Sequence, residues 1–322
     1  MNDIRWFAPN PYTTLVVPEL RRRGLGIEVE GQGPARLALA MSGTVAEQAW
    51  RYAAARGCPL VVFIWDLPPD RLGAGSHDPV WWLGGRFLQL PRPVRGFASH
   101  RRYYSRLRYI AAHAEEVWVP SAMTGSSVLN RFGLPSRRVP YCYDSERFRP
   151  APTIRDEPPT LLTVSRMEVH KNQAAVLRAA ARLGREVQVR LIGRGSECGR
   201  LEHLASSLSV RCRIDQQATD ADVVQAYHRA WVAVCPSRFE GFGLTPIEAI
   251  ASGTPVVASD IPPHRELGGD AASYFPLDDE DALVTAIAGA LDRAPPDRSV
   301  LRELTAPSAA ERFQALLQPL LR

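Results

Sequence analysis

Two glycines and two acidic residues lie in one short stretch, between a predicted strand over 232–235 and a predicted helix over 246–252. Gly241 and Gly243 would let the backbone approach a ligand closely. The free N–H groups at the start of the helix would face an anion such as a phosphate. The stretch therefore predicts an anion-binding loop. That loop consists of Gly241, Phe242, Gly243, Leu244 and Thr245.

The acidic residues that flank this loop are Glu240 and Glu248. Their carboxylates would suit the hydroxyl groups of a sugar and a ribose if both faced one cleft. A structural alternative fits the same spacing, because Thr245, Pro246 and Glu248 form a capping box with proline at the first helical position. A capping box needs no acid at position 240. Both interpretations of Glu248 stay open at this point.

A second group of candidate residues follows the strand predicted for 161–164. Arg166 and Lys171 lie just beyond it, and Lys171 is the only lysine among 39 basic residues. Two cations converging on one edge of a sheet would clamp a diphosphate. The alternative is a solvated connection between strand and helix, and the single lysine argues against it.

The elements that must position these residues alternate between strands and helices, which predicts parallel sheets and an α/β fold. A proline-rich segment over 150–159 divides the 322 residues into two such series. We expect domains over 1–150 and 151–306, and a final helix over 307–322 that packs back toward the first domain. Strands are predicted over 4–7, 26–30, 60–65, 117–121, 161–164, 188–192 and 232–235. Helices are predicted over 14–23, 44–56, 99–114, 122–132, 173–183, 197–208, 221–230 and 246–252.

A glycine turn and an acidic run complete the pattern of the second domain. Gly193 and Gly195 follow the strand over 188–192 and resemble part of a dinucleotide-binding turn, without its third glycine. Their interest lies in their position, because the carboxyl ends of neighbouring parallel strands converge on one crevice. The acidic run over 278–281 is interpreted as the solvated start of a helix and not as a metal site.

Composition restricts the cellular setting. The five cysteines are scattered without CxxC spacing, and the chain has no leader pattern and no apolar run able to span a bilayer. We therefore expect a cytoplasmic protein, at most peripheral to the inner face of the membrane. Residues 1–150 hold 20 arginines against 12 acidic residues, so an anionic partner is expected.

Part of this positive charge is concentrated in a stretch from Arg92 to Arg108 that also contains aromatic residues. It could be a solvated helix face, a contact for anionic lipid or a lipid-phosphate acceptor, or a nucleic-acid surface. No motif supports the last of these, and no nucleic-acid partner is expected. The residues are Arg92, Arg95, His100, Arg101, Arg102, Tyr103, Tyr104, Arg106 and Arg108.

Together the three motifs resemble those of the retaining glycosyltransferases of family 4. The resemblance is dense over 160–288, and its motifs are the Arg166 and Lys171 pair, the glycine turn, and Glu240 with Glu248 as the E-x7-E signature. It implies a GT-B fold, in which two Rossmann-like domains face each other across a cleft. It also implies transfer of a mannose- or glucose-type sugar from a nucleotide diphosphate to a glycan, lipid-linked or small-molecule acceptor. GDP-mannose is the preferred donor, ahead of UDP-sugars.

The resemblance assigns roles to individual residues of the second domain. Arg166 and Lys171 would neutralise the leaving diphosphate, so that neither a divalent metal nor a cofactor is needed. Glu240 would contact the donor sugar as a further catalytic residue, and Glu248 would hold the ribose. The loop over 241–245 would line the phosphates, and the two glycines of the turn count among the donor-binding residues.

The first domain resembles the family less closely. The glycine-rich loop usual after the first strand is replaced by residues 9–14, and a histidine-aspartate pair appears here as Trp65 and Asp66. Asp66 could still act as a catalytic residue that orients an acceptor hydroxyl, or it could cap a neighbouring loop. A rival interpretation therefore stays open: a nucleotide-sugar-binding or scaffold protein whose first domain has lost acceptor chemistry.

Overall fold

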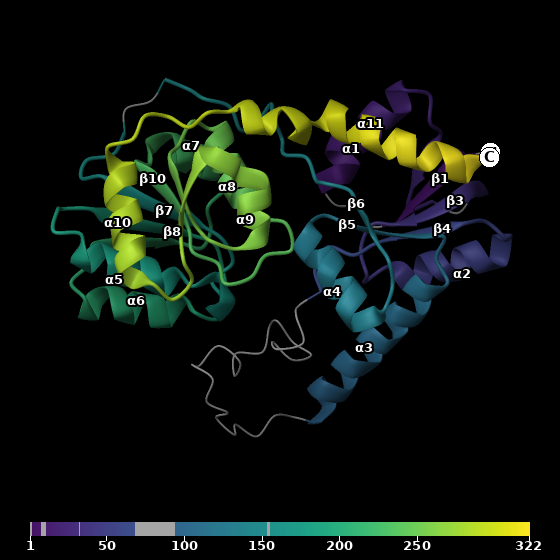
Figure 1. Cartoon of the computed structure of the whole chain (residues 1–322), viewed down its shortest axis with the longest axis horizontal. Helices are drawn as coiled ribbons and strands as arrows, with labels where there is room; N and C mark the ends of the chain where they lie inside the picture. Colours follow the sequence, from purple (N-terminus) through teal and green to yellow (C-terminus); the bar gives the residue numbers. More distant parts are fainter. Residues whose placement is uncertain (1, 8–10, 32, 68–93, 153–154) are drawn as a thin grey trace. The chain divides into compact units, whose positions relative to one another are not determined.

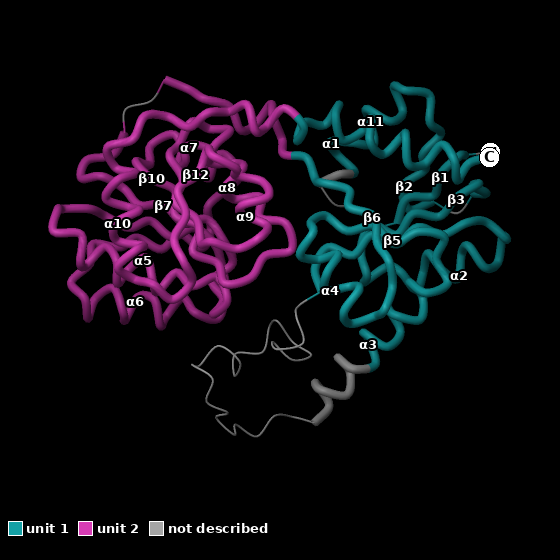
Figure 2. Tube along the Cα trace, viewed as in Figure 1, with its two compact units in different colours: residues 1–142, 303–322 teal, residues 143–302 magenta. Residues whose placement is uncertain are grey.

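The computed structural model of the chain describes residues 2–7, 11–31, 33–67, 94–152 and 155–322, with the backbone alone described at 11–12 and 94–101 (Figure 1). The chain divides into two compact units. Unit 1 comprises Met1–Cys142 and Glu303–Arg322, and unit 2 comprises Tyr143–Arg302 (Figure 2). The divisions therefore fall after residues 142 and 302, whereas the sequence analysis placed them after residues 150 and 306.

Unit 1 is built on a six-stranded parallel sheet in the order β2-β1-β3-β4-β5-β6. The strands are β1 (Asn2–Phe7), β2 (Ile27–Val29), β3 (Ala35–Ala40), β4 (Leu60–Phe63), β5 (Glu116–Val119) and β6 (Arg137–Arg138). The helices are α1 (Pro11–Arg22), α2 (Ala46–Arg56), α3 (Val94–Ala112), α4 (Ala122–Phe132) and α11 (Ala306–Leu317).

Helices cover both faces of this sheet, so the central strands β1, β3 and β4 are buried over most of their length. On one face, side chains such as Ala38 and Val62 pack in a core with residues of α2, α3 and α4. On the other face, α11 runs beside α1 (Figure 1). Phe313 of α11 contacts the rings of Trp6 and Trp118, at centroid distances of 5.9 and 5.3 Å. The last helix is therefore part of the core of unit 1.

Unit 2 is built on a second six-stranded parallel sheet, in the order β12-β11-β10-β7-β8-β9. Helices α5, α6 and α10 cover one face, and α7, α8 and α9 cover the other (Figure 1). The strands are β7 (Thr160–Val164), β8 (Gln188–Ile192), β9 (Cys212–Asp215), β10 (Val232–Cys235), β11 (Val256–Ser259) and β12 (Ala272–Phe275). The helices are α5 (Gln173–Arg182), α6 (Cys198–Ser207), α7 (Asp220–Arg229), α8 (Leu244–Ala251), α9 (Pro262–Gly268) and α10 (Glu280–Leu291).

The order of the strands in unit 2 reverses between β7 and β10. From β7 the chain adds β8 and β9 on one side, and it then returns to add β10, β11 and β12 on the other. In open parallel sheets, ligands bind at such a reversal, in the crevice outside the carboxyl ends of the strands. Arg166 and Lys171 follow β7 and Glu240 follows β10. The topology therefore brings both predicted motifs to the reversal.

The structure confirms the predicted α/β class and most of the predicted elements. The sequence analysis missed β3, β6, β9, β11, β12 and α9, and it extended β4 two residues too far. The acidic run over 278–281 does begin a helix, because the Asp279 side chain accepts a hydrogen bond from the amide of Ala282 at 2.9 Å and caps α10. None of the described helices has both the length and the hydropathy needed to cross a bilayer.

Candidate functional site

Lys171 and Glu240 meet at the reversal of the unit 2 sheet. Lys171 ends a short 3₁₀ turn after β7, and its ammonium donates a hydrogen bond to Oε1 of Glu240 at 2.7 Å. Both side chains are largely buried, with 13% and 17% of their surface exposed. The loop after β10 is fixed to the same turn, since the amide of Arg238 donates to the carbonyl of His170 at 2.8 Å. Residues from two separate motifs thus form one cluster.

Neighbouring charges set the protonation states in this cluster. Burial alone would raise the pKa of the Glu240 carboxyl, but Lys171, and after it His264, outweigh burial and hold that pKa below its ordinary value. Burial, assisted by the charge of Lys171, lowers the pKa of His170 to about 4. At neutral pH the cluster therefore contains an ammonium, a carboxylate and a neutral imidazole.

Arg166, the second predicted cation, lies closer to solvent. Its side chain is 58% exposed, and Nη1 lies 2.8 Å from Oε1 of Glu168. Like Lys171, it contributes to the lowered pKa of His170, so both cations act on the same imidazole. Of the two, Lys171 is held in a buried ion pair, whereas Arg166 is largely exposed and pairs with Glu168.

The glycine loop enters α8 without a side-chain cap. Gly243 is the N-cap residue, with φ at +93°, and Leu244 begins the helix. Thr245 donates its hydroxyl to the carbonyl of Val164 at 3.2 Å, which fixes α8 to β7. The capping-box alternative is therefore wrong, because the helix begins before Thr245 and the side chain of Thr245 is used elsewhere. The backbone N–H groups of the first turn lack a side-chain cap, and such groups can bind an anion.

Glu248 lies one turn further along α8, next to groups from two other segments. The hydroxyl of Tyr227 donates to Oε2 of Glu248 at 3.2 Å, and the charge of Arg147 favours the ionised carboxyl. Burial outweighs both and raises the pKa of Glu248 to about 7. The two glutamates of the signature therefore differ, because the pKa of Glu240 is lowered and that of Glu248 is raised.

The glycine turn after β8 lies against the backbone of the loop after β7. A Cβ atom at Gly193 would lie 2.0 Å from the carbonyl oxygen of Ser165, and one at Gly195 would lie 2.1 Å from that of Met167. Only glycine permits so close an approach. The two glycines thus shape the loop that carries Arg166, and their part in donor binding stays a prediction.

His264 of α9 belongs to this site and was missed by the sequence analysis. Its ring is 1% exposed, and Nδ1 lies 3.0 Å from the carbonyl oxygen of Ser259, which requires the proton to be on Nδ1. Nε2 has no hydrogen-bond partner among the described residues. A Cβ at Gly243 would lie 3.2 Å from the ring. The imidazole therefore packs against the glycine loop, and a lone histidine carried no sequence pattern that would have revealed it.

Asp66, the remaining predicted catalytic residue, belongs to unit 1, where it follows β4 and is exposed. Burial, with added contributions from Tyr104 and Asp66, raises the pKa of Tyr103 to about 12. The indole of Trp65 donates to the carbonyl of Met41, just after β3. Asp66 therefore lies with aromatic side chains at the carboxyl edge of the unit 1 sheet, and its catalytic role stays a prediction.

The basic stretch is described only in part. Arg92 lies outside the described residues, as do the side chains of Arg95, His100 and Arg101. On the remainder of α3, Arg102 and Arg108 are exposed, Tyr103 is 39% exposed, and Arg106 forms an ion pair with Glu47 of α2. The described part of the helix thus carries three exposed arginines, one of them paired with Glu47, which fits a solvated face and a lipid contact alike.

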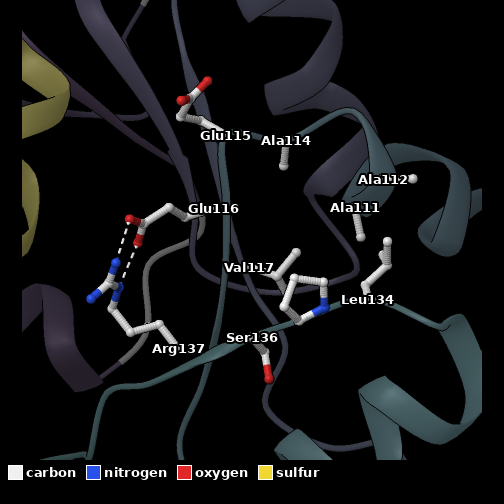
Figure 3. Close-up of a pocket in the computed structure, with 10 residues that line it drawn as sticks. Ala111, Ala112, Ala114, Glu115, Glu116, Val117, Leu134, Ser136 and Arg137 are labelled. Carbon is white, nitrogen blue, oxygen red and sulfur yellow. Dashed lines mark hydrogen bonds and ion pairs between the residues drawn. The ribbon is translucent and has the colours of Figure 1, made fainter.

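A pocket of about 490 Å³ lies elsewhere in unit 1 (Figure 3). It is formed by the end of α3 and by the segments that lead into β5 and β6. Arg137 closes part of it by donating to both carboxylate oxygens of Glu116 at 2.9 Å. The pocket opens at the amino ends of the strands, opposite the edge at which α/β sheets bind ligands, so it is not assigned to chemistry.

Comparison with known proteins supplies the family. Residues 144–303 match the model described as glycosyl transferases group 1. The chain is 33% identical over 175 residues to a phosphatidyl-myo-inositol mannosyltransferase of Mycolicibacterium smegmatis, covering 51% of this chain but only 45% of that protein. It is 31% identical over 258 residues to a GDP-mannose-dependent alpha-(1-6)-phosphatidylinositol monomannoside mannosyltransferase of the same organism, covering 66% of this chain and 67% of the relative.

Solved structures show the same fold over almost the whole chain. A glycosyltransferase from Rickettsia africae superimposes with a TM-score of 0.73 at 13% identity, covering 100% of this chain and 99% of that one. Anabaena HepE in complex with UDP-glucose gives 0.72 at 14% identity, covering 99% and 100%. At such identities the likeness shows the fold alone. The fold is GT-B, with two Rossmann-like units.

Proposed function

The chain belongs to the glycosyl transferases of group 1, and from this premise we propose that it is a retaining, metal-independent hexosyltransferase. The observation that carries the proposal is the ion pair between Lys171 and Glu240, beside the uncapped first turn of α8. It combines a cation suited to a diphosphate with a carboxylate suited to sugar hydroxyls, at the point of the sheet where ligands bind.

The chemistry of sugar transfer places negative charge on the leaving diphosphate as the bond from the anomeric carbon to the phosphate oxygen breaks. Lys171, Arg166 and the first N–H groups of α8 would stabilise that charge, and such preorganised groups are the largest source of rate enhancement in many enzymes. A diphosphate would compete with Glu240 for the ammonium of Lys171. Glu240 would then be released to accept a hydrogen bond from the donor sugar.

Unit 2 offers protein cations for this task, because Lys171 and Arg166 both follow β7 at the carboxyl edge of the sheet. In a retaining transfer without metal, the acceptor hydroxyl attacks on the face from which the phosphate leaves, so it must lie beside the leaving oxygen, which would take the hydroxyl proton as the new bond forms. Asp66 would orient that hydroxyl, and a mannose-type donor is supported by the mannosyltransferases among the relatives.

We expect GDP to be released from GDP-mannose faster than UDP is released from UDP-sugars. We also expect GDP to be released equally fast with and without excess EDTA. The insensitivity to EDTA is expected because protein cations neutralise the diphosphate. The preference for GDP-mannose is expected from the relative whose name gives GDP-mannose as its donor. Release of nucleotide and transfer of labelled mannose are measured together, with phosphatidylinositol vesicles and a glycan panel as acceptors. Turnover restored only by Mg²⁺ or Mn²⁺ would contradict the metal-independent mechanism. A donor that raises the melting temperature but is never turned over would favour the rival, a nucleotide-sugar-binding protein.

We further propose that α3 contacts anionic lipid through its exposed cations. Replacing Arg102 and Arg108 by glutamine is expected to weaken binding to phosphatidylserine vesicles by about 1 kcal/mol for each charge removed. Co-sedimentation with vesicles measures the effect. The matched control is Arg22→Gln, because Arg22 is 70% exposed on α1 of the same unit. Equal losses for Arg22 and the α3 variants, or no loss at all, would leave α3 as a solvated helix.

A further inference from the structure

Tyr227 is a fully buried residue that neither the sequence motifs nor the proposed mechanism uses. It lies on α7, its side chain is 0% exposed, and its hydroxyl lies 3.2 Å from Oε2 of Glu248. Burial, and after it the adjacent charge of Glu248, raises the pKa of Tyr227 well above its ordinary value, so the phenol keeps its proton. The hydroxyl therefore donates to the carboxylate, and one oxygen of Glu248 is held by the protein itself.

The ring of Tyr227 is fixed by its surroundings. The ring of Phe148 contacts it edge-on, at a centroid distance of 6.0 Å and an interplanar angle of 76°. The buried hydroxyl of Thr254 donates to the carbonyl of Tyr227 at 2.7 Å. At the start of α7, Asp220 accepts a hydrogen bond from Arg147 at 2.8 Å. A side chain held this firmly imposes its geometry on the carboxylate that it contacts.

We propose that Tyr227 is a positioning residue, which orients the carboxylate of Glu248 to accept hydrogen bonds from the 2′- and 3′-hydroxyls of the donor ribose. The inference rests on the proposed function, because that function assigns the ribose to Glu248. It also accounts for a buried phenol aimed at a carboxylate on a different helix, for which helix packing alone offers no reason.

The same hydrogen bond influences the charge of Glu248. Burial raises the pKa of this carboxyl, Tyr227 and Arg147 oppose the rise, and Asp220 adds to it. Cys235 on β10 also interacts with Glu248, but burial raises its own pKa to a level at which the thiol stays neutral. Removal of the Tyr227 hydroxyl would therefore shift the pKa of Glu248 further upward. A ligand that needs the ionised carboxylate would then require a higher pH to bind.

The test compares the binding of two ligands to two forms of the protein. Wild-type protein and Tyr227→Phe are titrated calorimetrically with GDP and with 2′,3′-dideoxy-GDP, or with the uridine pair if the wild type prefers UDP. We expect Tyr227→Phe to bind GDP about 3- to 10-fold more weakly, the range for one net hydrogen bond. Dideoxy-GDP should bind both proteins equally, because it lacks the ribose hydroxyls that would donate hydrogen bonds to Glu248.

The pH dependence supplies a readout that a merely structural role would not move. Both ligands carry the same terminal phosphate, so the effect of its titration cancels in the ratio of GDP affinity to dideoxy-GDP affinity. In the wild type this ratio should rise through a midpoint near pH 7, the pKa of Glu248. In Tyr227→Phe the midpoint should move upward by about one pH unit. An unmoved midpoint, or an equal loss of affinity for both ligands, would overturn the positioning role.

Two controls separate this inference from the function on which it rests. Tyr52→Phe removes a hydroxyl that donates to the carbonyl of Gly33 at 2.8 Å in unit 1, and it should leave both affinities unchanged. If the wild type does not distinguish GDP from dideoxy-GDP, the ribose assignment itself fails. If Tyr227→Phe does not fold, site-specific 3-fluorotyrosine at position 227 is a second variant. As a stronger donor it should lower the midpoint, and an unchanged midpoint would count against the inference.

Discussion

Replacing Lys171 by alanine is expected to lower kcat by about 10²- to 10³-fold, the scale for loss of one preorganised group that stabilises transition-state charge. The ammonium is the buried member of the two predicted cations, so no solvent ion replaces it at low cost. Initial rates with saturating GDP-mannose measure kcat, and calorimetric titration with GDP measures the ground-state contribution. A larger effect on kcat than on GDP affinity identifies an interaction that is strongest in the transition state.

This variant also disturbs the structure, because it leaves the carboxylate of Glu240 buried without its partner. A matched control is available in the same unit. Asp215 pairs with Arg190 at 2.8 Å and with Arg213 at 2.7 Å, its side chain is 14% exposed, and these pairs have no part in the proposed chemistry. The double variant Arg190→Ala/Arg213→Ala leaves that carboxylate without its partners, and it should destabilise the fold while kcat per folded molecule stays near wild type. A fall below about threefold for Lys171→Ala, or an equal fall for the double variant, would return Lys171 to a structural role.

Replacing Glu248 by glutamine is expected to weaken GDP binding about 10- to 100-fold at pH 8, because a hydrogen bond to a charged group contributes about 1.5 to 3 kcal/mol. Loss of helix capping cannot explain such a result, since Gly243 and not Thr245 caps α8. Glutamine still accepts a hydrogen bond from Tyr227. An unchanged dissociation constant would defeat the assignment of the ribose to Glu248.

The same variant should be more stable than the wild type without nucleotide, and the sign follows from the raised pKa. Glu248 has a pKa of about 7 in the folded protein and an ordinary value of 4.5. Between these values the unfolded chain ionises while the folded one stays protonated, so the free energy of unfolding falls as pH rises. Well above pH 7 the full penalty, on the order of 3 kcal/mol, applies to the wild type but not to Glu248→Gln.

Melting curves at two pH values check this expectation. Glu248→Gln should be more stable than the wild type at pH 8 and equally stable at about pH 4.5. Glu240→Gln is the matched control within the signature. The pKa of Glu240 is lowered, so its ionised form stabilises the fold above its ordinary pKa and loses that effect as pH falls. Glu240→Gln should therefore destabilise the protein at pH 8. If both substitutions changed the stability at pH 8 in the same direction, the two glutamates would not differ in environment as described.

The fold class and the position of the candidate loop at the edge of a sheet could be predicted from the sequence, because both follow from short-range patterns. The apolar run at β10, two glycines and a helix signal suffice to place a loop at the carboxyl edge of a sheet. Of the missed strands, β11 has a comparable apolar run, over 256–258, that was overlooked, whereas others lack such a pattern. In β3, alanines alternate with leucines, and alanine is a weak strand former. Burial between β1 and β4 makes β3 a strand, and that is a tertiary effect.

The charge states of the site residues could not be predicted from the sequence, because they too follow from contacts between residues far apart in the chain. The sequence gives Glu240 and Glu248 the same residue type in one motif, but it does not show that Lys171 lies 2.7 Å from one of them. Nor does it show that a phenol from α7 meets the other. The partners are 69 and 21 residues away in the chain. The opposite pKa shifts of the two glutamates arise only when the folded chain brings these partners into contact.

The return of the last helix to unit 1 has a consequence for synthesis. Unit 2 is continuous in the chain and leaves the ribosome whole, whereas unit 1 stays incomplete until residues 303–322 have been translated. Until then the surfaces of Trp6 and Trp118 lack the ring of Phe313. An apolar face left open in a nascent domain favours aggregation and chaperone binding. Folding of unit 1 is therefore completed only after residues 303–322 have been made.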